Sequence, residues 1–425
     1  MAARAGIVVT GTEVLTGRVV DRNGPWLAER LREAGVDVGR TVVVGDRRED
    51  LAAALRFQLT DHDLVLTTGG LGPTADDLTA EVVAEVQGRP SAVDADLEAR
   101  ITAIVERLYR QRGWQVDDDV VRRGVRKQAL VPEGAVTLGP VGTAPGLVVP
   151  GPGAPVVVLP GPPSELQGMW DEALASDPVR AALAGAATLL QSTVRIWGPP
   201  EARLVGVLDA HEAAVGPLED AGLEITTCVR DGELEIVTRY APEAAPAYDG
   251  LVAALHADFG DLLYADDGRT VDDVVADLLL ARDGTIATAE SCTAGLLAGR
   301  LADRPGSSSY LLGGFVTYAN EAKTAEVGVP ADLIASVGAV SREVAEAMAS
   351  GARARLGTTV GVGITGVAGP GGGTPDKPVG LVHVAVDVDG VLTHRELRLG
   401  GDRALIRRRT VVAALHLVRQ ALGGA

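Results

Sequence analysis

The chain has 425 residues, which is too long for one ordinary hydrophobic core and predicts two or three domains. Its net charge of −18 disfavours unspecific nucleic-acid binding, and its two distant cysteines, Cys228 and Cys292, exclude a disulfide framework and a cysteine zinc site. The apolar run near the start is too short for a signal peptide and no run is long enough to span a membrane, so we expect a cytoplasmic protein.

Strands alternate with helices in the first 90 residues. We expect strands at 6–10, 36–44 and 63–68, and helices at 21–34, at 48–59 and from about residue 78. This alternation predicts a parallel α/β sheet with right-handed crossovers, in which ligands bind beyond the carboxyl ends of the strands. Three loops fall at that edge, and they contain Glu13, Asp46 and the pair Asp76 and Asp77.

The third of these loops, GGLGPTADD, has the composition of a phosphate site. Gly69, Gly70 and Gly72 let backbone N–H groups approach a phosphate closely. Asp76 and Asp77 are suited to holding a hard divalent cation together with substrate phosphates, although acidic residues are also common in the first turn of a helix. The glycines and acids together favour a functional site. A second glycine cluster, GPVGTAPG at 139–146, either lines the same cleft or forms a simple turn.

From about residue 170 the composition changes to alanine-rich helical stretches around TVRIWG and LEITTCVRDGELEIVTRY. Asp231-Gly232 between two alternating segments predicts a β-hairpin. This part is expected to be a small α+β spacer with a structural role, because it has neither a GXXG clamp nor a basic stripe for RNA. Thr270-Val271-Asp272-Asp273 is a capping-box pattern that opens a helix over 271–282 and marks the last domain boundary.

The last part of the chain is expected to form an α/β sandwich. The pattern predicts strands at 285–290, 312–318, 358–365, 380–387 and 391–399, and helices at 292–302, at 341–356 and from about Asp402. Asp389-Gly390 predicts an antiparallel hairpin between the last two strands. Ser291, Tyr318 and Thr365 each fall at the carboxyl end of a predicted strand, which places three hydroxyls at one edge of the sheet.

Ser291 has two interpretations. Taken with its own stretch alone, TIATAESCTAGLLAGR, it is most simply the N-cap of the following helix. It becomes a nucleophile only with a base, and Lys323, five residues after Tyr318 at the start of a short helix, is within reach. His383 and His394 offer no convincing alternative, since the first lies inside a strand and the second on the exposed hairpin. Cys292 is a rival nucleophile if a helix N-terminus lowers the pKa of its thiol.

Two further features suit a phosphate. The glycine-rich loop 364–380 is long for a plain surface connection, so we expect it to cradle a phosphate or to form a lid. Arg403 and Arg407 are placed to pair with a phosphate bidentately, whereas a solvated helix face accounts for Arg408 and Arg409.

Several motifs together resemble a known family. TTGGLGPTADD, GTEVLTG, KQALVPEGA, GTAPG and LPGPPSE resemble the MoaB/MogA-type molybdopterin-binding fold and the N-terminal half of the CinA family (competence/damage-inducible protein CinA). AESCTAG, GGFVTYANEAK, GVGITGVAGPGGG, KPVGLV and GDR resemble its C-terminal domain, the nicotinamide mononucleotide deamidase. Two positions depart from the family pattern: Gly139 and Pro140 stand where an asparagine is usual, and Ala294 stands where a second glycine is usual.

The resemblance covers nearly the whole chain and implies three domains. These are a MoaB/MogA-like parallel-sheet domain over 1–169, a KH-like α+β spacer domain over 170–269, and the CinA deamidase domain, an α/β sandwich, over 270–425.

For the C-terminal domain, the resemblance implies hydrolysis of the amide of nicotinamide mononucleotide to nicotinate mononucleotide and ammonia, with no cofactor. It places the family's nucleophile on Ser291, its tyrosine on Tyr318, its lysine on Lys323, its site threonine on Thr365 and its phosphate-binding arginine on Arg403 or Arg407. The expected mechanism uses Lys323 as the base, Tyr318 as a proton relay and the backbone N–H groups of Cys292 and Thr293 for the oxyanion, while Gly369, Gly371 and Gly372 are expected to bind substrate.

For the N-terminal half, the resemblance implies metal-dependent hydrolysis of the pyrophosphate in ADP-ribose or a similar dinucleotide. Gly69, Gly70, Gly72 and Thr74 are the expected substrate-binding residues, and Asp76, Asp77 and Glu13 are the expected ligands of a divalent metal. The alternatives are a pterin-phosphate or nucleotide-binding module without turnover, and a competence-related protein that interacts with DNA, which the charge disfavours. We expect small nucleotide substrates, no membrane or nucleic-acid partner, and a homodimer.

Overall fold

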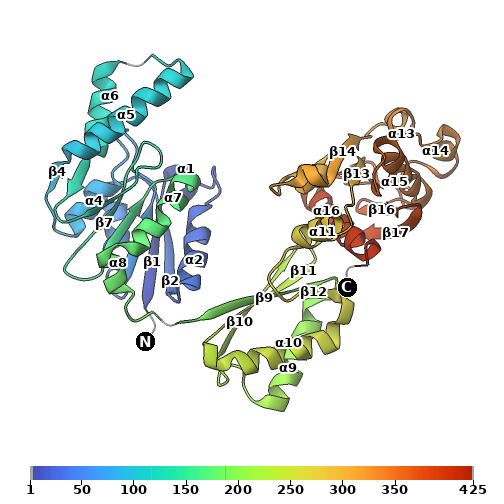
Figure 1. The fold of residues 1–425 in the computed structure, drawn as a ribbon, viewed down its shortest axis with the longest axis horizontal. Helices are drawn as coiled ribbons and strands as arrows, with labels where there is room; N and C mark the ends of the chain where they lie inside the picture. Colours follow the sequence, from blue (N-terminus) through green and yellow to red (C-terminus); the bar gives the residue numbers. More distant parts are fainter. Residues whose placement is uncertain (1–2, 116, 187, 424–425) are drawn as a thin grey trace. The chain divides into compact units, whose positions relative to one another are not determined.

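The computed structural model describes residues 3–115, 117–186 and 188–423. It divides into two compact units, Met1–Leu190 and Gln191–Ala425 (Figure 1). Each unit has its own hydrophobic cores. Within the described ranges, no helix is both long enough and apolar enough to cross a membrane.

The first unit is built on a six-stranded sheet with the strand order β2-β1-β3-β8-β7-β6. Its strands are β1 (Arg4–Thr10), β2 (Asp37–Val44), β3 (Leu64–Thr68), β6 (Val136–Leu138), β7 (Gly146–Val149) and β8 (Val156–Leu159). The first four strands of this order run parallel, as predicted, whereas β7 and β6 are added antiparallel. The connection between β7 and β8 is short, and a short connection allows only antiparallel pairing, so the sheet is mixed.

Helices cover both faces of this sheet. On one face lie α2 (Asn23–Glu33), α7 (Pro163–Ala175) and α8 (Asp177–Ala182), and on the other lie α3 (Arg48–Gln58) and α4 (Thr79–Val86). Side chains alternate between the two cores along β1, so Ile7 and Val9 face the first group of helices and Val8 faces the second. The short helix α1 (Thr12–Leu15) follows β1 directly.

A helical hairpin that the sequence analysis did not assign completes the first unit. It consists of α5 (Ala95–Arg112) and α6 (Asp118–Gln128), flanked by the two-stranded ribbon of β4 (Ser91–Val93) and β5 (Leu130–Pro132). Its own small core contains Leu97, Ile101 and Val125, and Figure 1 shows its two helices side by side.

The second unit begins with a four-stranded sheet of order β10-β11-β9-β12. Its elements are β9 (Leu190–Trp197), β10 (Leu223–Arg230), β11 (Glu233–Tyr240) and β12 (Leu263–Ala265), with α9 (Glu201–Val215) and α10 (Ala245–Phe259) packed on one face. The predicted hairpin is confirmed: β10 and β11 pair antiparallel, and Asp231 (φ 54°) and Gly232 (φ 95°) form its tight turn.

The rest of the second unit is the expected α/β sandwich, with the strand order β14-β13-β15-β16-β17. Its strands are β13 (Ile286–Glu290), β14 (Leu311–Val316), β15 (Val360–Gly366), β16 (Leu381–Val388) and β17 (Val391–Arg398). Its helices are α11 (Val271–Leu280), α12 (Leu296–Ala302), α13 (Asn320–Val327), α14 (Ala331–Val337), α15 (Arg342–Leu356) and α16 (Arg403–Ala421). Strands β14, β13 and β15 run parallel to one another, and β16 pairs antiparallel with β15. Strands β16 and β17 form the predicted antiparallel hairpin.

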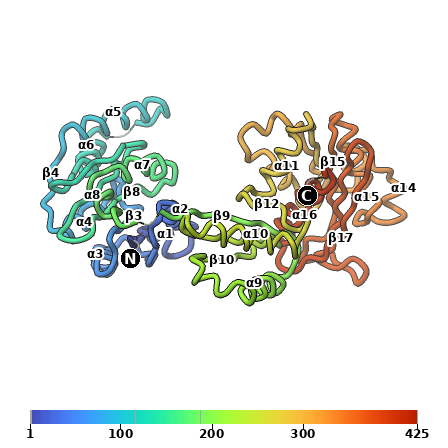
Figure 2. The backbone as a smooth tube through the Cα atoms, turned by 60° about the horizontal axis from the view of Figure 1, so that its bottom comes forward, coloured from blue at the N-terminus to red at the C-terminus, as the bar shows by residue number. Residues whose placement is uncertain are grey.

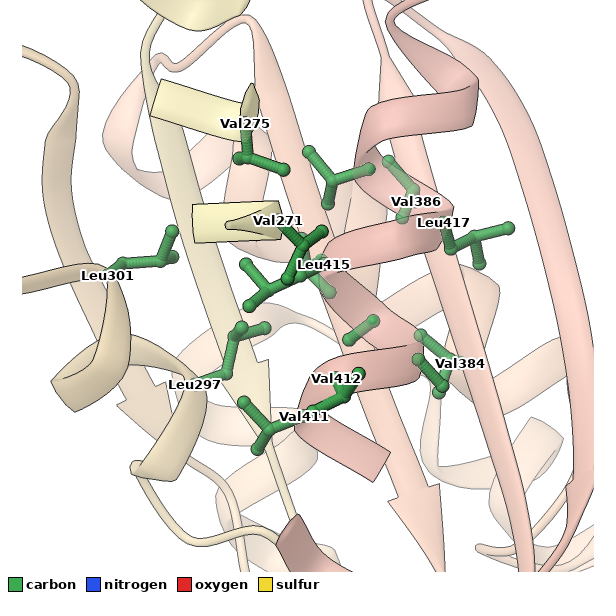
Figure 3. Close-up of a cluster of buried hydrophobic side chains, with 14 of the residues drawn as sticks. Val271, Val275, Leu297, Leu301, Val384, Val386, Val411, Val412, Leu415 and Leu417 are labelled. Carbon is green, nitrogen blue, oxygen red and sulfur yellow. The ribbon is translucent and has the colours of Figure 1, made fainter. Parts of the chain in front are cut away.

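Two helix layers enclose this sheet, with α16 on one face and α15 on the other (Figure 1; Figure 2). Figure 3 shows Val384 and Val386 of β16 directed at the α16 side, where they meet Val412 and Leu415. On the other face glycine allows close packing: a Cβ at Gly361 would lie 2.1 Å from the carbonyl oxygen of Ala349 in α15.

The four-stranded sheet and α16 share a core. The Trp197 ring stacks on His416 with the ring centroids 4.3 Å apart, and Trp197 and Tyr264 belong to the same buried cluster as Leu415. Glu233 accepts hydrogen bonds of 2.7 Å from Tyr264 Oη and from His416 Nε2. Burial lowers the pKa of His416 to about 4, so the ring is neutral at neutral pH. The capping box at Thr270 is confirmed, but the packing continues across it.

Candidate active site

Ser291 lies in a turn directly after β13 and not at a helix N-cap. The following helix, α12, begins at Leu296, with Gly295 (φ 90°) before it and no side chain of the preceding residue capping it. The predicted helix start at 292 and the capping role of Ser291 are therefore wrong. Positive φ values at Ala294 (51°) and Gly295 interrupt helical backbone at this point. We call residues 291–295 the serine turn.

The cap of α12 comes from Glu290, the last residue of β13. This fully buried carboxylate accepts hydrogen bonds from the N–H groups of Gly295 (3.0 Å), Leu297 (3.1 Å) and Ala298 (2.9 Å). The unpaired N–H groups of a helix start stabilise an anion, which explains how a carboxylate is buried here. The sequence analysis did not predict a role for Glu290. The one feature that could have indicated it is that Glu290 is the only charged residue of the predicted strand, at its carboxyl end.

Lys323 is the ionisable side chain that contacts the Ser291 hydroxyl. It lies on α13, its side chain is 1% exposed, and its Nζ is 3.2 Å from Ser291 Oγ. The same Nζ donates to the carbonyl oxygens of Thr317 (2.9 Å) and Tyr318 (3.2 Å). Burial lowers the pKa of Lys323.

This set of contacts suits a neutral amine. The two carbonyls can only accept, so they take two N–H bonds of Nζ. A neutral amine then has its lone pair left for the third contact, the Ser291 hydroxyl. The predicted pairing of the serine with a desolvated lysine is therefore present in the geometry.

The segment after β14 positions these carbonyls. Thr317 N–H donates to the carbonyl oxygen of Glu290 (2.8 Å), which ties the end of β14 to the end of β13. The side chain of Tyr318 points elsewhere: it is 56% exposed, and its hydroxyl accepts a hydrogen bond from Arg403 Nη2 (2.9 Å). The backbone of Tyr318, and not its hydroxyl, contacts Lys323, so the expected proton relay through the hydroxyl is not formed here.

Thr365 adjoins the serine turn but its hydroxyl is already engaged. The N–H of Ser291 donates to the carbonyl oxygen of Ile364 (2.9 Å), which places β15 beside the turn. The buried Thr365 hydroxyl donates to the carbonyl oxygen of Ala339 (2.8 Å). The structure thus brings Thr365 to the site's edge and gives it a role in holding the loop before α15.

Two backbone N–H groups in the serine turn have no acceptor. Ala294 N–H donates to the carbonyl oxygen of Ser291 (3.2 Å), but within the described part of the chain neither Cys292 nor Thr293 donates its N–H to another residue. Both residues are buried, at 5% and 0% exposure. Backbone N–H groups in buried residues are nearly always paired, so these two groups are available as donors to a ligand oxygen.

Cys292 itself does not supply a reactive thiolate. Burial raises the pKa of its thiol to about 12, so the thiol remains protonated at neutral pH. The sequence-based possibility that a helix N-terminus activates this thiol is wrong, because no helix begins at Cys292 and the side chain is desolvated.

The structure separates the roles of the two arginines. Arg407 donates from Nε to the Cys292 carbonyl oxygen (3.0 Å) and from Nη2 to the Thr293 carbonyl oxygen (2.7 Å). Arg403, one helical turn earlier and exposed, donates to the carbonyl oxygen of Gly369 (2.8 Å) and to the Tyr318 hydroxyl. Gly369 therefore lies beside Arg403, whereas Gly371 and Gly372 are exposed further along the same loop.

The first unit contains a separate cleft of about 800 Å³ at the carboxyl ends of its parallel strands. Every site residue predicted for this half lines it: Glu13, Gly69, Gly70, Gly72, Thr74, Asp76 and Asp77. Thr143 and Ala144 line it too, so the GPVGTAPG cluster does belong to the same cleft. Sequence reasoning missed Asp21, Asn23 and Glu165, which also line it.

The structure does not bring Glu13, Asp76 and Asp77 together as one three-ligand metal cluster. The Thr74 hydroxyl donates to both Asp76 and Asp77, and its hydrogen bond lowers the pKa of Asp76. Among the described residues, no three acidic, histidine or cysteine side chains come close enough to hold a metal ion. The predicted ligand set of Glu13 with Asp76 and Asp77 is therefore wrong as a cluster, and at most two neighbouring carboxylates are available to a cation.

Family models match most of the first unit and the larger part of the second. Residues 268–422 match the family model described as the CinA C-terminal domain, and residues 6–179 match a probable molybdopterin binding domain. A CinA-like protein of Mycolicibacterium gilvum is 56% identical over 427 residues and covers all of both chains, and one of Mycobacterium tuberculosis is 52% identical over 428 residues, covering 100% of this chain and 98% of that protein.

Solved structures match parts of the chain. The competence/damage inducible protein CihA from Agrobacterium tumefaciens is 42% identical and covers 36% of this chain and 95% of its own, with a TM-score of 0.35. The molybdopterin biosynthesis enzyme MoaB from Thermus thermophilus is 17% identical and covers 43% of this chain and 97% of its own, with a TM-score of 0.29. From the full-length relatives and the two family models, the chain belongs to the CinA family.

Proposed function

We propose that the second unit is a nicotinamide-nucleotide amidohydrolase, which converts nicotinamide mononucleotide to nicotinate mononucleotide and ammonia. The observation that carries this proposal is the buried pair of Ser291 and Lys323, with Nζ 3.2 Å from Oγ and two carbonyls occupying the other contacts of the amine. The pair supplies an activated hydroxyl for acyl transfer, and membership of the CinA family supports the nicotinamide nucleotide as the substrate.

In the first half of the reaction, Ser291 Oγ attacks the carboxamide carbon while its proton passes to Lys323 Nζ. Burial favours the neutral amine that accepts this proton. Negative charge develops on the carboxamide oxygen, and the N–H groups of Cys292 and Thr293 are the donors suited to stabilise it. Lys323 then returns the proton to the departing nitrogen, so that ammonia leaves and an ester to Ser291 remains.

In the second half, water attacks the ester with Lys323 again accepting a proton. The C–Oγ bond breaks, Ser291 regains its proton, and nicotinate mononucleotide is released. The residues of the chain supply each proton transfer in this sequence. Thr365 supports it indirectly, because its hydroxyl holds the Ala339 carbonyl beside the strand that contacts Ser291.

The phosphate of the substrate is assigned to Arg403. Its guanidinium is exposed and lies between Gly369 of the glycine-rich loop and the Tyr318 hydroxyl. An arginine beside a glycine-rich loop suits bidentate phosphate recognition. Gly371 and Gly372 belong to the same loop, and Tyr318 is then a substrate-binding group that orients Arg403.

The direct test is ammonia release from nicotinamide mononucleotide by the purified full chain, with the Ser291→Ala protein as the matched control. We expect release from the wild type and a loss of about 10³-fold or more in the variant, since removal of a nucleophile leaves only binding and oxyanion contributions. Equal rates in the two proteins would overturn the serine mechanism, and no release from the wild type would overturn the substrate.

A second activity, hydrolysis of the pyrophosphate of ADP-ribose or a similar dinucleotide, is proposed for the first unit. The supporting observation is the cleft of about 800 Å³, which gathers three glycines, Thr74, Asp76 and Asp77. A Cβ at Gly69, which has a φ of 101°, would lie 2.4 Å from the carbonyl oxygen of Thr10, so only glycine fits there, and a Cβ at Gly72 would displace the Asp77 carboxylate.

Two neighbouring carboxylates fit a hard divalent cation that takes its remaining ligands from substrate phosphates and water. Such a cation, when bound, neutralises charge on the phosphoryl oxygens. The test is release of AMP from ADP-ribose with and without a chelator. Tight binding of a pterin phosphate without turnover would instead favour the binding-module alternative, and retention on DNA at physiological salt would favour the competence-related one.

A further inference from the structure

Two buried or half-buried charges of opposite sign hold the serine turn. Glu290 accepts from the N–H groups on the helix side of the turn, at Gly295, Leu297 and Ala298. Arg407 donates to the carbonyl oxygens in the middle of the turn, at Cys292 and Thr293. Each charged side chain binds the backbone groups that match its chemistry: the carboxylate only accepts and binds N–H groups, and the guanidinium only donates and binds carbonyl oxygens.

The contacts of Arg407 directly fix the direction of one of the two unpartnered N–H groups, that of Thr293. A peptide unit is planar and trans, so the Cys292 carbonyl and the Thr293 N–H belong to one plane and point in opposite directions. By holding that carbonyl at 3.0 Å, Arg407 directs the Thr293 N–H away from α16. Its second bond, to the Thr293 carbonyl, fixes the next peptide plane, which carries the Ala294 N–H. That N–H donates to the Ser291 carbonyl oxygen (3.2 Å), and the same peptide as this carbonyl carries the Cys292 N–H, so Arg407 holds the Cys292 N–H indirectly.

The same contacts leave Arg407 poorly placed for phosphate. A guanidinium can bind an oxyanion bidentately through its Nε–Nη2 edge or its Nη1–Nη2 edge, and in the half-buried Arg407 both atoms of the first edge already donate to backbone carbonyls. Arg403 keeps its Nε free of any hydrogen bond within the described residues. The two arginines lie four residues apart and therefore on one face of α16, but they contact different groups. Arg407 binds the serine turn, and Arg403 binds Gly369 and the Tyr318 hydroxyl.

We propose that Arg407, together with Glu290, is a positioning residue of the deamidase. The two side chains fix the serine turn so that the N–H groups of Cys292 and Thr293 face the oxygen of the attacked carbonyl. This inference rests on the proposed deamidation, and it removes Arg407 from the phosphate site, where sequence reasoning had left it as an alternative to Arg403.

The experiment compares Arg407→Gln, Arg407→Lys and Arg403→Gln on two substrates, nicotinamide mononucleotide and nicotinamide riboside, which lacks the phosphate. Arg408→Gln is the matched control, since the exposed Arg408 follows Arg407 on α16 and pairs with Asp231 of the β10–β11 hairpin (2.9 Å). Steady-state kcat and KM are measured for each protein on both substrates.

For Arg407→Gln we expect kcat to fall about 10²-fold on both substrates with little change in KM, the scale of losing one oxyanion donor. Arg407→Lys should recover part of this loss, because an ammonium reaches one carbonyl but not two. Arg403→Gln should raise KM for the mononucleotide by about 10-fold or more and leave the riboside unaffected. A rise in KM for the mononucleotide alone in Arg407→Gln would identify Arg407 as a phosphate ligand and overturn the proposal.

Two readouts separate this proposal from the deamidase assignment. The first is hydrogen exchange of the peptide covering 291–299, which should speed up in Arg407→Gln and Glu290→Gln but not in Arg408→Gln. The second is the rate at which a fluorophosphonate labels Ser291, in which the Oγ–P bond forms and fluoride leaves; its phosphoryl oxygen needs the same N–H donors. If the wild type is labelled but releases no ammonia, the proposed substrate fails. Unchanged exchange and unchanged labelling in Arg407→Gln would overturn the positioning role itself.

Discussion

Replacing Lys323 tests whether its amine acts as a base or as a fixed charge. Lys323→Arg keeps a positive charge but cannot give up its proton in a useful pH range, and Lys323→Met removes the charge and keeps the length. A positioned base contributes about 10²–10⁴-fold to a rate, and each tenfold is about 1.4 kcal/mol of barrier. We therefore expect both variants to lose about 10²–10⁴ in kcat, or about 3–5 kcal/mol, while calorimetry still detects nicotinamide mononucleotide binding.

The pH dependence of the wild-type rate tests the same role of Lys323 as a base. Burial lowers the pKa of Lys323, and the neutral amine is the active form. The rate kcat/KM should therefore rise tenfold per pH unit below that lowered pKa and level off above it. The rising limb should lie below the range of an ordinary lysine, and it should vanish from the residual activity of Lys323→Met.

Loss of folding must be separated from loss of the base. Arginine is larger than lysine, and overpacking a tight site costs about 1–3 kcal/mol of stability. Tyr310→Phe is the matched control, because it removes a buried hydrogen bond to the Leu301 carbonyl (2.9 Å) at the opposite end of β13 and β14 from Ser291. It should lower the melting temperature and leave kcat unchanged. A Lys323→Arg enzyme with a near-normal rate would refute the base and leave the lysine as an anchor.

Three further outcomes are expected. In an ammonia-release assay, Cys292→Ala should keep most deamidase activity and Ser291→Ala should lose nearly all of it, because the pKa of the Cys292 thiol is raised to about 12. The reverse result would make the protein a thiol hydrolase. Ala294→Gly should raise the free energy of unfolding by about 1 kcal/mol, because Ala294 has a φ of 51°, which glycine adopts more easily than alanine. The melting temperature should then rise by about 2–4 °C, and an unchanged melting temperature would mean that the alanine in this turn is not strained. A chelator, like Asp77→Ala, should stop hydrolysis of ADP-ribose and spare deamidation measured on the same preparations, and parallel loss of both activities would show that the two sites are coupled.

Much of the fold could be predicted because periodicity reflects burial directly. The strands at the centre of both large sheets are continuous apolar runs, and the Asp231-Gly232 and Asp389-Gly390 turns fix two hairpins through their positive φ values. What could not be predicted are features without a local pattern. The antiparallel β6 and β7 are short, and the α5–α6 hairpin forms its own small core apart from the sheet.

The residues of the candidate site and the pairing of Ser291 with Lys323 could be predicted, but the contacts that hold the serine turn could not. Ser291, Lys323 and the two arginines could be named from their types and positions. The start of α12 was predicted wrongly because Glu290 satisfies that helix from within the preceding strand, an arrangement that a search for an N-cap residue does not find. The partner of Arg407 lies 115 residues away in the chain, so only the register of α16 against the serine turn reveals its role.

The packing around α16 has a consequence for how the second unit unfolds. Residues from Thr410 to Arg419 are buried without interruption, so this helix is surrounded on every side and lies between the five-stranded sheet and the Trp197 face of the four-stranded one. Separating the two sheets would expose the stacked ring of His416 and remove the hydrogen bond between His416 and the Glu233 carboxylate. We therefore expect the segment after Thr270 to unfold together with the four-stranded sheet in one cooperative transition. Amide protons in the two sheets should therefore exchange through a common opening event.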